Sequence, residues 1–357
     1  MFTTPATGAS KRAYELHRRM PPDLGFTAFV TGGFSKEWKR EFPDFQFVEV
    51  CGSRSFLRRL REGSSSFWRK LLDEHGCGLW VTDTLPVPSR PGNVRTCITV
   101  HDLRYLESWR YVSLRRFILL KAFMGRSLAR ADSVVAVSSW TGGQLEERYA
   151  LSGSKLSVIG NAVDPDRFGT EGADGEHFQR PYLLSVGHLE RRKNIRTLVE
   201  AFGKIADRWD GYLVLVGRDQ GSLGSIKAAA RKYGVRERLM IRQGLDFDRL
   251  VQLYRNCEAV VCPSEYEGFG LTPLEGMAAG RPVVASDIPP HREVAGEAAL
   301  YADPKDAGGF AASILKVIED RSVSDVLVES GRERVRMFSW QRSAEKLVSL
   351  YRELLGR

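Results

Sequence analysis

Residues 259–287, AVVCPSEYEGFGLTPLEGMAAGRPVVASD, contain two short apolar runs with a helical stretch between them. The first run, AVVCPS, ends at Ser264, and the second, PVVASD, follows Gly280, a residue type that commonly ends a helix. Short apolar runs joined by helical segments are typical of strands that are buried on both faces of a parallel sheet. The stretch therefore predicts an α/β fold.

The same alternation continues in both directions along the chain. Further apolar runs that end in Gly, Ser, Asp or a similar residue lie at 26–32, 45–50, 78–83, 97–102, 133–139, 156–161, 182–187, 212–217 and 239–244. Stretches of helical period, such as 195–207 and 225–233, separate the runs of the second half. We expect doubly wound parallel sheets.

The length of 357 residues predicts two domains, since one domain commonly holds about 100–200 residues. A polar, glycine-rich stretch divides the strands, which predicts an N-terminal domain over 1–168, a linker over 169–180 and a C-terminal domain over 181–339. Ligands of such sheets bind at the carboxyl ends of the strands, so we expect a cleft between the two domains. A final amphipathic helix over 340–357 is expected to pack back across the domain junction.

One turn lacks the strand that normally precedes it. PATGASKRAYEL begins at Pro5 and contains Gly8, but no apolar run comes before it. Either the first domain lacks one edge of its sheet, or the natural chain starts upstream.

Composition limits the class of protein. Hydrophobic residues make up 43% and charged residues 27%, as in a soluble globular protein, and the net charge of +9 suits an anionic partner. The five cysteines form no CxxC pair or Cys/His zinc pattern, which indicates thiols in a reducing cytoplasm. No apolar run is long enough to span a membrane and no signal peptide is visible, so we expect a cytoplasmic protein whose membrane contact is peripheral, at the inner face.

The loop within 259–287 carries the chemistry. Gly268 and Gly270 precede a helix that we expect to be capped by Thr272, with Glu275 completing a capping box. A glycine loop that leads into a helix N-terminus presents free N–H groups to a phosphate. A carboxylate repels a bare phosphate, so Glu267 and Glu275 are better suited to accept hydrogen bonds from sugar hydroxyls. Phosphate and sugar together indicate a nucleotide sugar.

Glu267, seven intervening residues and Glu275 resemble the signature of the retaining GT-B glycosyltransferases of glycosyltransferase family 4. The resemblance extends along the chain through further motifs: PATGASKRAYEL, TVHDL (99–103), VSSWT (137–141), VIGNAVDPDRF (158–168), SVGHLERRKNIRTLVEAF (185–202) and FSW (338–340). It implies the GT-B fold, in which two doubly wound Rossmann-like domains face each other across a cleft.

The resemblance also implies roles for residues of the second half. Glu267 would lie by the transferred sugar and Glu275 would bind the ribose. The backbone that would hold the sugar and the diphosphate comprises Gly268, Phe269, Gly270 and Leu271. Lys193 and Arg192 would neutralise the departing diphosphate, and the alternative for 191–193 is a solvated basic run of the kind that is common on surfaces. Gly187 and His188 would lie at the phosphates; many relatives have Arg where this chain has His188, so a structural role for this histidine stays open.

In the first half, the resemblance implies that His101 lies by the reacting sugar and that the backbone around Gly8 approaches the diphosphate. A lone histidine is more commonly a packed residue, but His101 follows an apolar run, at the end of a strand where ligands bind. Ser138 and Asn161 also match family positions, and either residue could simply shape the cleft or the linker.

Asp164-Pro165-Asp166 has the Asp-x-Asp spacing of metal-dependent glycosyltransferases, but it lies in the linker motif and has proline between the acids. We therefore expect no metal ion and no other cofactor. A basic stretch at 52–70 and the helix after TVHDL, with its arginines beside FILL, suit either an anionic membrane or a solvated helix face. No nucleic-acid-binding motif is visible.

The expected function is retaining transfer of a sugar from a nucleoside diphosphate sugar, with GDP-mannose the first candidate. The acceptor would be a glycan or a lipid-linked molecule in bacterial surface polysaccharide assembly. A nucleotide-sugar epimerase on the same fold and a non-catalytic sugar-nucleotide sensor are the alternatives. A NAD-dependent dehydrogenase fits poorly, because Gly217, Gly221 and Gly224 lack the GxGxxG spacing.

Overall fold

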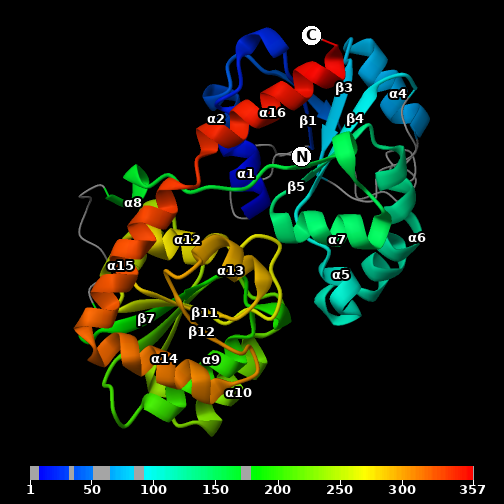
Figure 1. Cartoon of the computed structure of the whole chain (residues 1–357). Coiled ribbons are helices and arrows are strands. Elements are labelled where there is room, and N and C mark those ends of the chain that lie inside the picture. Colours follow the sequence, from blue (N-terminus) through cyan, green and yellow to red (C-terminus); the bar gives the residue numbers. More distant parts are fainter. Residues whose placement is uncertain (1–7, 32–35, 51–64, 84–91, 170–177, 357) are drawn as a thin grey trace. The chain divides into compact units, whose positions relative to one another are not determined.

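The computed structural model describes residues 8–31, 36–50, 65–83, 92–169 and 178–356. The chain forms two compact units (Figure 1): unit 1 holds Met1–Asn161 and Trp340–Arg357, and unit 2 holds Ala162–Ser339. The first change of unit therefore comes earlier than the predicted end of the N-terminal domain at residue 168. Most of the predicted linker 169–180 lies outside the described residues.

Unit 1 contains parallel strands in two sheets. β1 (Thr27–Thr31) pairs with β2 (Gln46–Val50), and a four-stranded sheet has the order β3-β4-β5-β6. The strands of that sheet are β3 (Leu79–Thr82), β4 (Arg95–Val100), β5 (Ser133–Ala136) and β6 (Leu156–Val158). The helices of this unit are α1 (Gly8–His17), α2 (Lys36–Glu41), α4 (Ser65–Glu74), α5 (Arg104–Glu107), α6 (Leu114–Arg130), α7 (Ser139–Tyr149) and α16 (Trp340–Leu355), with 3₁₀ turns η1 (Pro22–Leu24), η2 (Trp109–Tyr111) and η3 (Gly153–Lys155). Residues 1–7, ahead of the turn at Gly8, lie outside the described part of the chain.

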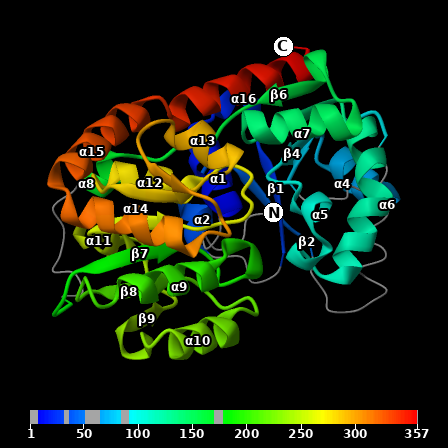
Figure 2. The ribbon, with the colours of Figure 1, turned by 60° about the horizontal axis from the view of Figure 1, so that its bottom comes forward.

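The last helix, α16, belongs to unit 1, where it packs against α1 and β3. The predicted apolar face is real: Leu347 and Tyr351 are buried, and Ser343 Oγ donates to the Gly160 carbonyl at 2.9 Å. The approach to β3 is close, because a Cβ at Gly78 would lie 2.9 Å from Leu355 Cδ2. In Figure 2, α16 is the red helix at the top of the view, next to β6 of unit 1.

Unit 2 contains one six-stranded parallel sheet in the order β12-β11-β10-β7-β8-β9. Its strands are β7 (Tyr182–Val186), β8 (Tyr212–Val216), β9 (Leu239–Arg242), β10 (Ala259–Cys262), β11 (Val283–Ser286) and β12 (Leu300–Ala302). The chain adds strands on one side of β7 and then on the other, so the sheet is doubly wound as predicted. Its order reverses between β7 and β10, and ligands of such sheets bind at this point.

Helices connect all of these strands. They are α8 (Asp166–Gly169), α9 (Ile195–Ile205), α10 (Leu223–Lys232), α11 (Phe247–Asn256), α12 (Leu271–Ala278), α13 (Pro289–Ala295), α14 (Ala307–Glu319) and α15 (Arg321–Arg336), with 3₁₀ turns η4 (Arg191–Lys193) and η5 (Arg236–Arg238). α9 packs against α10 and α14, while α12 packs against α13 and α15. Buried aliphatic side chains of the strands and of α9 and α14 form the largest part of the core.

Each apolar run of the sequence contains a strand, and the short edge strand β12 was missed. It has only the three residues LYA, which is too short for a periodic signal. Within the described ranges, no helix combines the length and the apolar character that a membrane span requires.

Candidate active site

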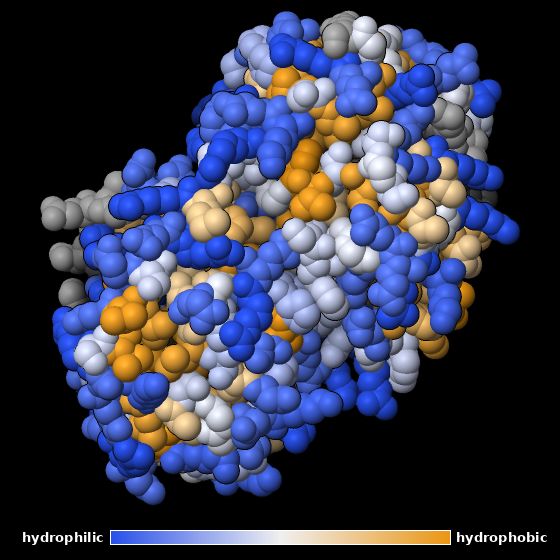
Figure 3. Space-filling view, in the orientation of Figure 1, coloured by the Kyte–Doolittle hydropathy of each residue, from blue (hydrophilic) through white to orange (hydrophobic). Residues whose placement is uncertain are grey.

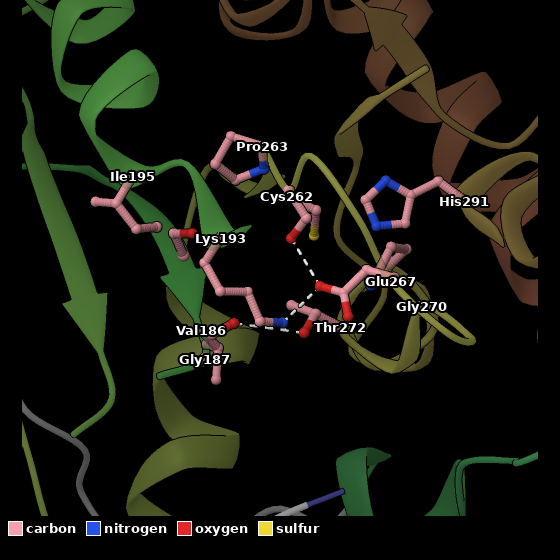
Figure 4. Close-up of a pocket in the computed structure, with 13 residues that line it drawn as sticks. Val186, Gly187, Lys193, Ile195, Cys262, Pro263, Glu267, Gly270, Thr272 and His291 are labelled. Carbon is pink, nitrogen blue, oxygen red and sulfur yellow. Dashed lines mark hydrogen bonds and ion pairs between the residues drawn. The ribbon is translucent and has the colours of Figure 1, made fainter. Parts of the chain in front are cut away.

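A pocket lies in unit 2 where β7 and β10 end (Figure 4), at the point where the strand order reverses. Its lining comes from the ends of β7 and β10 and from the loops and helices that follow: Ser185, Val186, Gly187, Lys193, Ile195, Cys262, Pro263, Ser264, Glu267, Gly270, Thr272, Pro273 and His291. The pocket thus combines the ends of two strands with residues from three connections of one sheet.

Glu267 is the centre of the charge network in this pocket. Its Oε1 accepts hydrogen bonds from Lys193 Nζ and Ser264 Oγ, each at 2.7 Å, and its Oε2 accepts from Arg192 Nη1 at 2.7 Å. Burial alone would raise the pKa of Glu267, but the charges of Arg192 and Lys193 outweigh it and hold the pKa well below its ordinary value. Glu267 is therefore a carboxylate that accepts hydrogen bonds throughout the physiological pH range.

The two cations are held in place by their turn. η4 ends at Asn194, which has a left-handed backbone (φ 53°), and Asn194 Nδ2 donates to the carbonyls of Pro263 at 3.0 Å and Pro304 at 2.6 Å. Glu265 N donates to the Arg192 carbonyl at 2.8 Å. The turn is thereby fixed to the loop after β10. The interpretation of 191–193 as a freely solvated run does not fit Arg192 and Lys193, whose side chains are only 13% and 15% exposed.

Gly187 follows β7 with a φ of 144°, and a Cβ there would lie 3.0 Å from Lys193 Cε. The absence of a side chain lets the lysine pass over the end of the strand toward Glu267, as Figure 4 shows. His188, the next residue, is half-buried, and burial lowers its pKa, which favours the neutral imidazole. Its Nδ1 is buried and has no hydrogen-bond partner among the residues that the structure describes.

The predicted capping box at the start of α12 is wrong. The helix begins at Leu271, its N-cap is Gly270 with a left-handed φ of 99°, and no side chain caps it. Thr272 lies inside the first turn and its Oγ1 donates to the Val186 carbonyl at 3.4 Å. Glycine suits position 270 because the backbone is left-handed and a Cβ there would lie 3.1 Å from His291 Cδ2. The first-turn N–H groups of Leu271 and Thr272 therefore lack intrahelical acceptors at the edge of the pocket.

Glu275 lies deeper in unit 2 than Glu267. It is buried, and its Oε2 accepts a hydrogen bond from the hydroxyl of Tyr254 at 2.8 Å. Burial and the neighbouring carboxylate raise the pKa of Tyr254 well above its ordinary value, so the hydroxyl keeps its proton. Of the predicted backbone positions, Gly270 lines the pocket, while Phe269 is buried and stacks edge-on against Phe338 at 5.9 Å between ring centroids.

His291 is a pocket residue that the sequence reasoning missed. It lies in α13, is 1% exposed, and its Nδ1 is 3.1 Å from the Ser286 carbonyl oxygen. Burial lowers the pKa of His291 to about 4, so the ring is neutral, with Nδ1–H donating to Ser286 and Nε2 left as an acceptor. Its position shortly after the end of β11 is a signal that could have identified it.

In unit 1, His101 follows β4 and Asp83 follows the neighbouring strand β3, and His101 Nε2 lies 3.5 Å from Asp83 Oδ2. Burial raises the pKa of Asp83, but the contact with the His101 imidazole and further favourable interactions outweigh it and bring the pKa to about 2. Arg12 of α1 is buried, which lowers its pKa to about 10, and its Nη1 donates to Asn161 Oδ1 at 2.8 Å. Asp83 and Arg12 were not predicted.

The other predicted site residues of unit 1 do not lie in the contact between His101 and Asp83. Gly8 is the exposed first residue of α1 and no atom lies within 4 Å of a Cβ built on it. Ser138 caps α7, because its Oγ accepts from Thr141 N at 3.0 Å. In unit 2, Asp166 begins α8, and no group of three or more potential metal ligands occurs among the described residues.

Several solved structures share this architecture over nearly the whole chain. The structure of Anabaena Alr3699/HepE in complex with UDP and glucose has a TM-score of 0.77 and 16% identity and covers 98% of this chain and 96% of that chain. WaaG, a glycosyltransferase involved in lipopolysaccharide biosynthesis, has a TM-score of 0.75 and 17% identity, with coverages of 97% and 96%. Such identities show the fold alone. The two Rossmann-like units therefore form the GT-B fold of glycosyltransferases.

Family models match both units. The model described as Glycosyltransferase Family 4 matches residues 6–167, and the model described as Glycosyl transferases group 1 matches residues 173–334. The chain therefore belongs to glycosyltransferase family 4 and is a hexosyltransferase. This confirms the family that the sequence motifs predicted.

Curated relatives include mannosyltransferases. O-antigen chain mannosyltransferase B of Escherichia coli is 27% identical over 269 residues, which is 73% of this chain and 71% of the relative. O-antigen chain mannosyltransferase RfbU of Salmonella typhimurium is 30% identical over 223 residues, which is 62% of this chain and 60% of the relative.

Proposed function

We propose that the enzyme transfers a hexosyl residue, with mannose from GDP-mannose as the first candidate, to a glycan or lipid-linked acceptor with retention of anomeric configuration. The observation that carries the proposal is the pocket at the strand reversal of unit 2, where Glu267 is hydrogen-bonded to Lys193 and Arg192. The mannosyltransferase names of the relatives support the sugar and a role in bacterial surface polysaccharide assembly.

The positive charges of Lys193 and Arg192 suit the nucleoside diphosphate that leaves in the reaction. A nucleoside diphosphate gains negative charge as the sugar bond breaks, and cations that are already fixed in place stabilise that charge without reorganisation. Lys193 and Arg192 are fixed in this way by η4 and Glu267. The start of α12 adds N–H groups without intrahelical acceptors and the positive end of a helix. We infer that the diphosphate binds to this group.

Glu267 suits the sugar. Because it stays ionised, it accepts hydrogen bonds from hydroxyl groups and has no proton to donate as a general acid. Its second effect is to hold Lys193 toward the pocket. For Glu275 we propose binding of the ribose, with its Oε2 oriented by the Tyr254 hydroxyl.

For unit 1 we propose that His101 contacts the transferred sugar and that the backbone at Gly8 approaches the diphosphate, as the family resemblance implies. His188 and Gly187 are proposed to lie near the phosphates. A neutral His188 would donate a hydrogen bond there and would add little charge. We also propose that the protein works in the cytoplasm at an anionic membrane surface.

Thermal unfolding with GDP, UDP, ADP, dTDP and NAD, each with and without EDTA, tests the donor site. A nucleotide at about 100 times its dissociation constant should stabilise the folded chain by about 2.7 kcal/mol. We expect one nucleoside diphosphate to do so, with the same shift in EDTA. A shift with NAD alone would contradict the donor site.

Transfer itself is measured with the radiolabelled sugar donor and a membrane extract as the source of acceptor. We expect label in the glycan or lipid fraction with the anomeric configuration of the donor. Conversion of the donor sugar without an acceptor would indicate an epimerase. Nucleotide binding with neither reaction would indicate a sensor.

A further inference from the structure

The ion-paired charges at the pocket of unit 2 cancel one another. Arg192 Nη1 and Lys193 Nζ each lie 2.7 Å from a carboxylate oxygen of Glu267, and Arg192 Nη2 lies 2.8 Å from Glu190 Oε1. The two cations can contact phosphate oxygens, but together with their two carboxylates they carry no net charge. A nucleoside diphosphate is strongly anionic, so positive charge beyond this set would favour its binding.

Arg218 lies at the end of β8, beside the strand end that lines the pocket. The pairing of β7 with β8 continues past both strands, because Gly187 N donates to the Val216 carbonyl and Leu189 N to the Arg218 carbonyl, each at 2.9 Å. This register places His188 opposite Arg218. Side chains in register on parallel strands project from the same face of the sheet, so these two side chains are neighbours.

The two strand ends approach each other closely because one of their residues is glycine. A Cβ at Gly217 would lie 1.8 Å from the Gly187 carbonyl oxygen, so any other residue there would push the ends of β7 and β8 apart. Burial is the main cause of the lowered pKa of His188, and the positive charge of Arg218 lowers it further. The charge of Arg218 is therefore felt next to the pocket residue Gly187.

Arg218 is a cation without a partner. Its side chain is exposed, and its guanidinium forms no ion pair or hydrogen bond with any residue that the structure describes. The adjacent Asp219 is engaged by the backbone, since its Oδ1 accepts from the N–H groups of Gly221, Ser222 and Leu223 at 2.9, 3.0 and 3.1 Å. Hydrophilic side chains cover much of the face drawn in Figure 3, so exposure alone does not distinguish an arginine. Arg218 is distinguished by its place beside the pocket.

We propose that Arg218 is a further donor-binding residue, whose guanidinium contacts the diphosphate from the β8 side and supplies positive charge that the ion-paired set lacks. This inference rests on the proposed function, because it needs a nucleoside diphosphate in the pocket of unit 2. A guanidinium suits the contact, since its planar array of N–H groups matches phosphate oxygens. No ion pair with a described residue has to break before Arg218 binds.

The test is isothermal titration calorimetry of the full chain with GDP, UDP, ADP and dTDP at low and at higher salt concentration. Arg218→Gln should raise the dissociation constant of the nucleotide that binds about tenfold at low salt, which corresponds to the loss of one charge-assisted hydrogen bond. The difference should shrink with added salt, because the side chain is exposed. Arg218→Lys keeps the charge and should raise the dissociation constant less, by about threefold.

The matched control is Arg231→Gln, which removes the same charge from an exposed position in the last turn of α10. This position lies about 12 Å along the helix from Leu223. A second control is Arg191→Gln, at the exposed first residue of η4. Both controls should bind the nucleotide like the unchanged chain. A loss in either control as large as that in Arg218→Gln would show that only the net charge of unit 2 matters, and would overturn the proposal.

The matching nucleoside, which carries no phosphate, tests the place of the contact. Its weaker binding, measured by competition with the nucleotide, should be the same in the unchanged chain and in Arg218→Gln. An equal loss for nucleoside and nucleotide would place Arg218 at the base or the ribose and contradict a contact with the diphosphate. Thermal unfolding without ligand checks that each variant folds, since substitution of an exposed side chain should change stability little.

The outcomes separate this inference from the proposed function. If none of the four nucleotides binds the unchanged chain, the donor site is contradicted, and the role of Arg218 with it. If a nucleotide binds the unchanged chain and Arg218→Gln equally well, the role of Arg218 is wrong and the donor site stands.

Discussion

The two units present polar side chains at the carboxyl ends of their parallel strands, but they differ in how completely those side chains are already paired. In unit 2, Glu267 accepts hydrogen bonds from Arg192, Lys193 and Ser264, each at 2.7 Å. The pocket is therefore organised around a mostly buried carboxylate whose charge is compensated within the protein. Such a site is assembled before a ligand arrives, which is the condition for electrostatic stabilisation of a transition state.

In unit 1, by contrast, hydrogen-bonding capacity is left over. His101 Nε2 lies 3.5 Å from Asp83 Oδ2 and has no hydrogen bond within the described part of the chain, and Arg12 Nη2 also lacks one there. Unit 2 thus provides fixed charge, whereas unit 1 provides donors that a ligand can still engage. The comparison suggests that substitutions in unit 2 act on charge and turnover, and those in unit 1 on orientation.

The largest effect is expected at the centre of unit 2. Glu267→Gln keeps the shape of the side chain but removes the charge that holds Lys193 and Arg192. We expect turnover to fall by about 10²–10³, by analogy with the loss of one stabilising transition-state contact. Glu297→Gln, at an exposed position of the same unit, is the control and should keep full turnover. Unchanged steady-state turnover in Glu267→Gln would contradict the role of this residue.

The buried histidine of the pocket should make stability depend on pH. The pKa of His291 is about 4 in the folded chain against 6.5 in the unfolded chain, so the unfolded chain gains a proton first as the pH falls. The contribution is fully present above pH 6.5 and about 3 kcal/mol is lost by pH 4. In urea unfolding at several pH values, His291→Gln should flatten this part of the curve. His17 of unit 1, with a pKa also lowered to about 4, is the comparison, and His17→Gln should remove a slope of similar size.

Asp83 should also make the stability depend on pH, but in a lower pH range than His291. Its pKa is about 2 in the folded chain against 3.8, because the contact with the His101 imidazole and further favourable interactions outweigh burial, so its stabilisation is present above pH 3.8 and lost as the pH falls toward 2. Asp83→Asn should lower the free energy of unfolding by about 2 kcal/mol at pH 7. Asp23→Asn, at an exposed ion pair with Arg352, should change it little. An identical pH curve in Asp83→Asn would rule out this coupling.

The smallest effects distinguish two serines that each follow a strand. Ser138 of unit 1 caps α7, so Ser138→Ala should cost about 1 kcal/mol of stability and leave turnover unchanged. Ser264 of unit 2 donates to Glu267, so Ser264→Ala should lower turnover several-fold through the orientation of that carboxylate. If the two variants lowered turnover equally, the proposed difference between the serines of the two units would be wrong.

Much of the fold could be predicted because each strand that the sequence indicated is a short, buried apolar run. β12 could not be, since three residues carry no periodic signal. The start of α12 was misplaced because Thr272 has the residue type of a cap, while the helix begins two residues earlier, after Gly270 in the left-handed conformation. That choice depends on the approach of His291, which no local pattern reports.

The motifs predicted individual residues of the candidate site. They did not predict which residues form hydrogen bonds with each other. The sequence named Glu267 and Lys193, but the hydrogen bond between them spans 74 positions. Arg12 and Asn161 are separated by 149 positions, and only the folded sheet brings them together. The motifs therefore identified which side chains matter, whereas the compensation of their charges required the structure.

The helix α16 ties the first unit to the very end of the chain. Because unit 1 comprises Met1–Asn161 and Trp340–Arg357, its last helix leaves the ribosome only after all of unit 2 has been synthesised. Unit 2 can complete its sheet during translation, while the surfaces of α1 and β3 that α16 covers stay exposed until this helix has been synthesised. A chaperone that protects apolar surface on nascent chains would therefore act on unit 1 for longer than on unit 2.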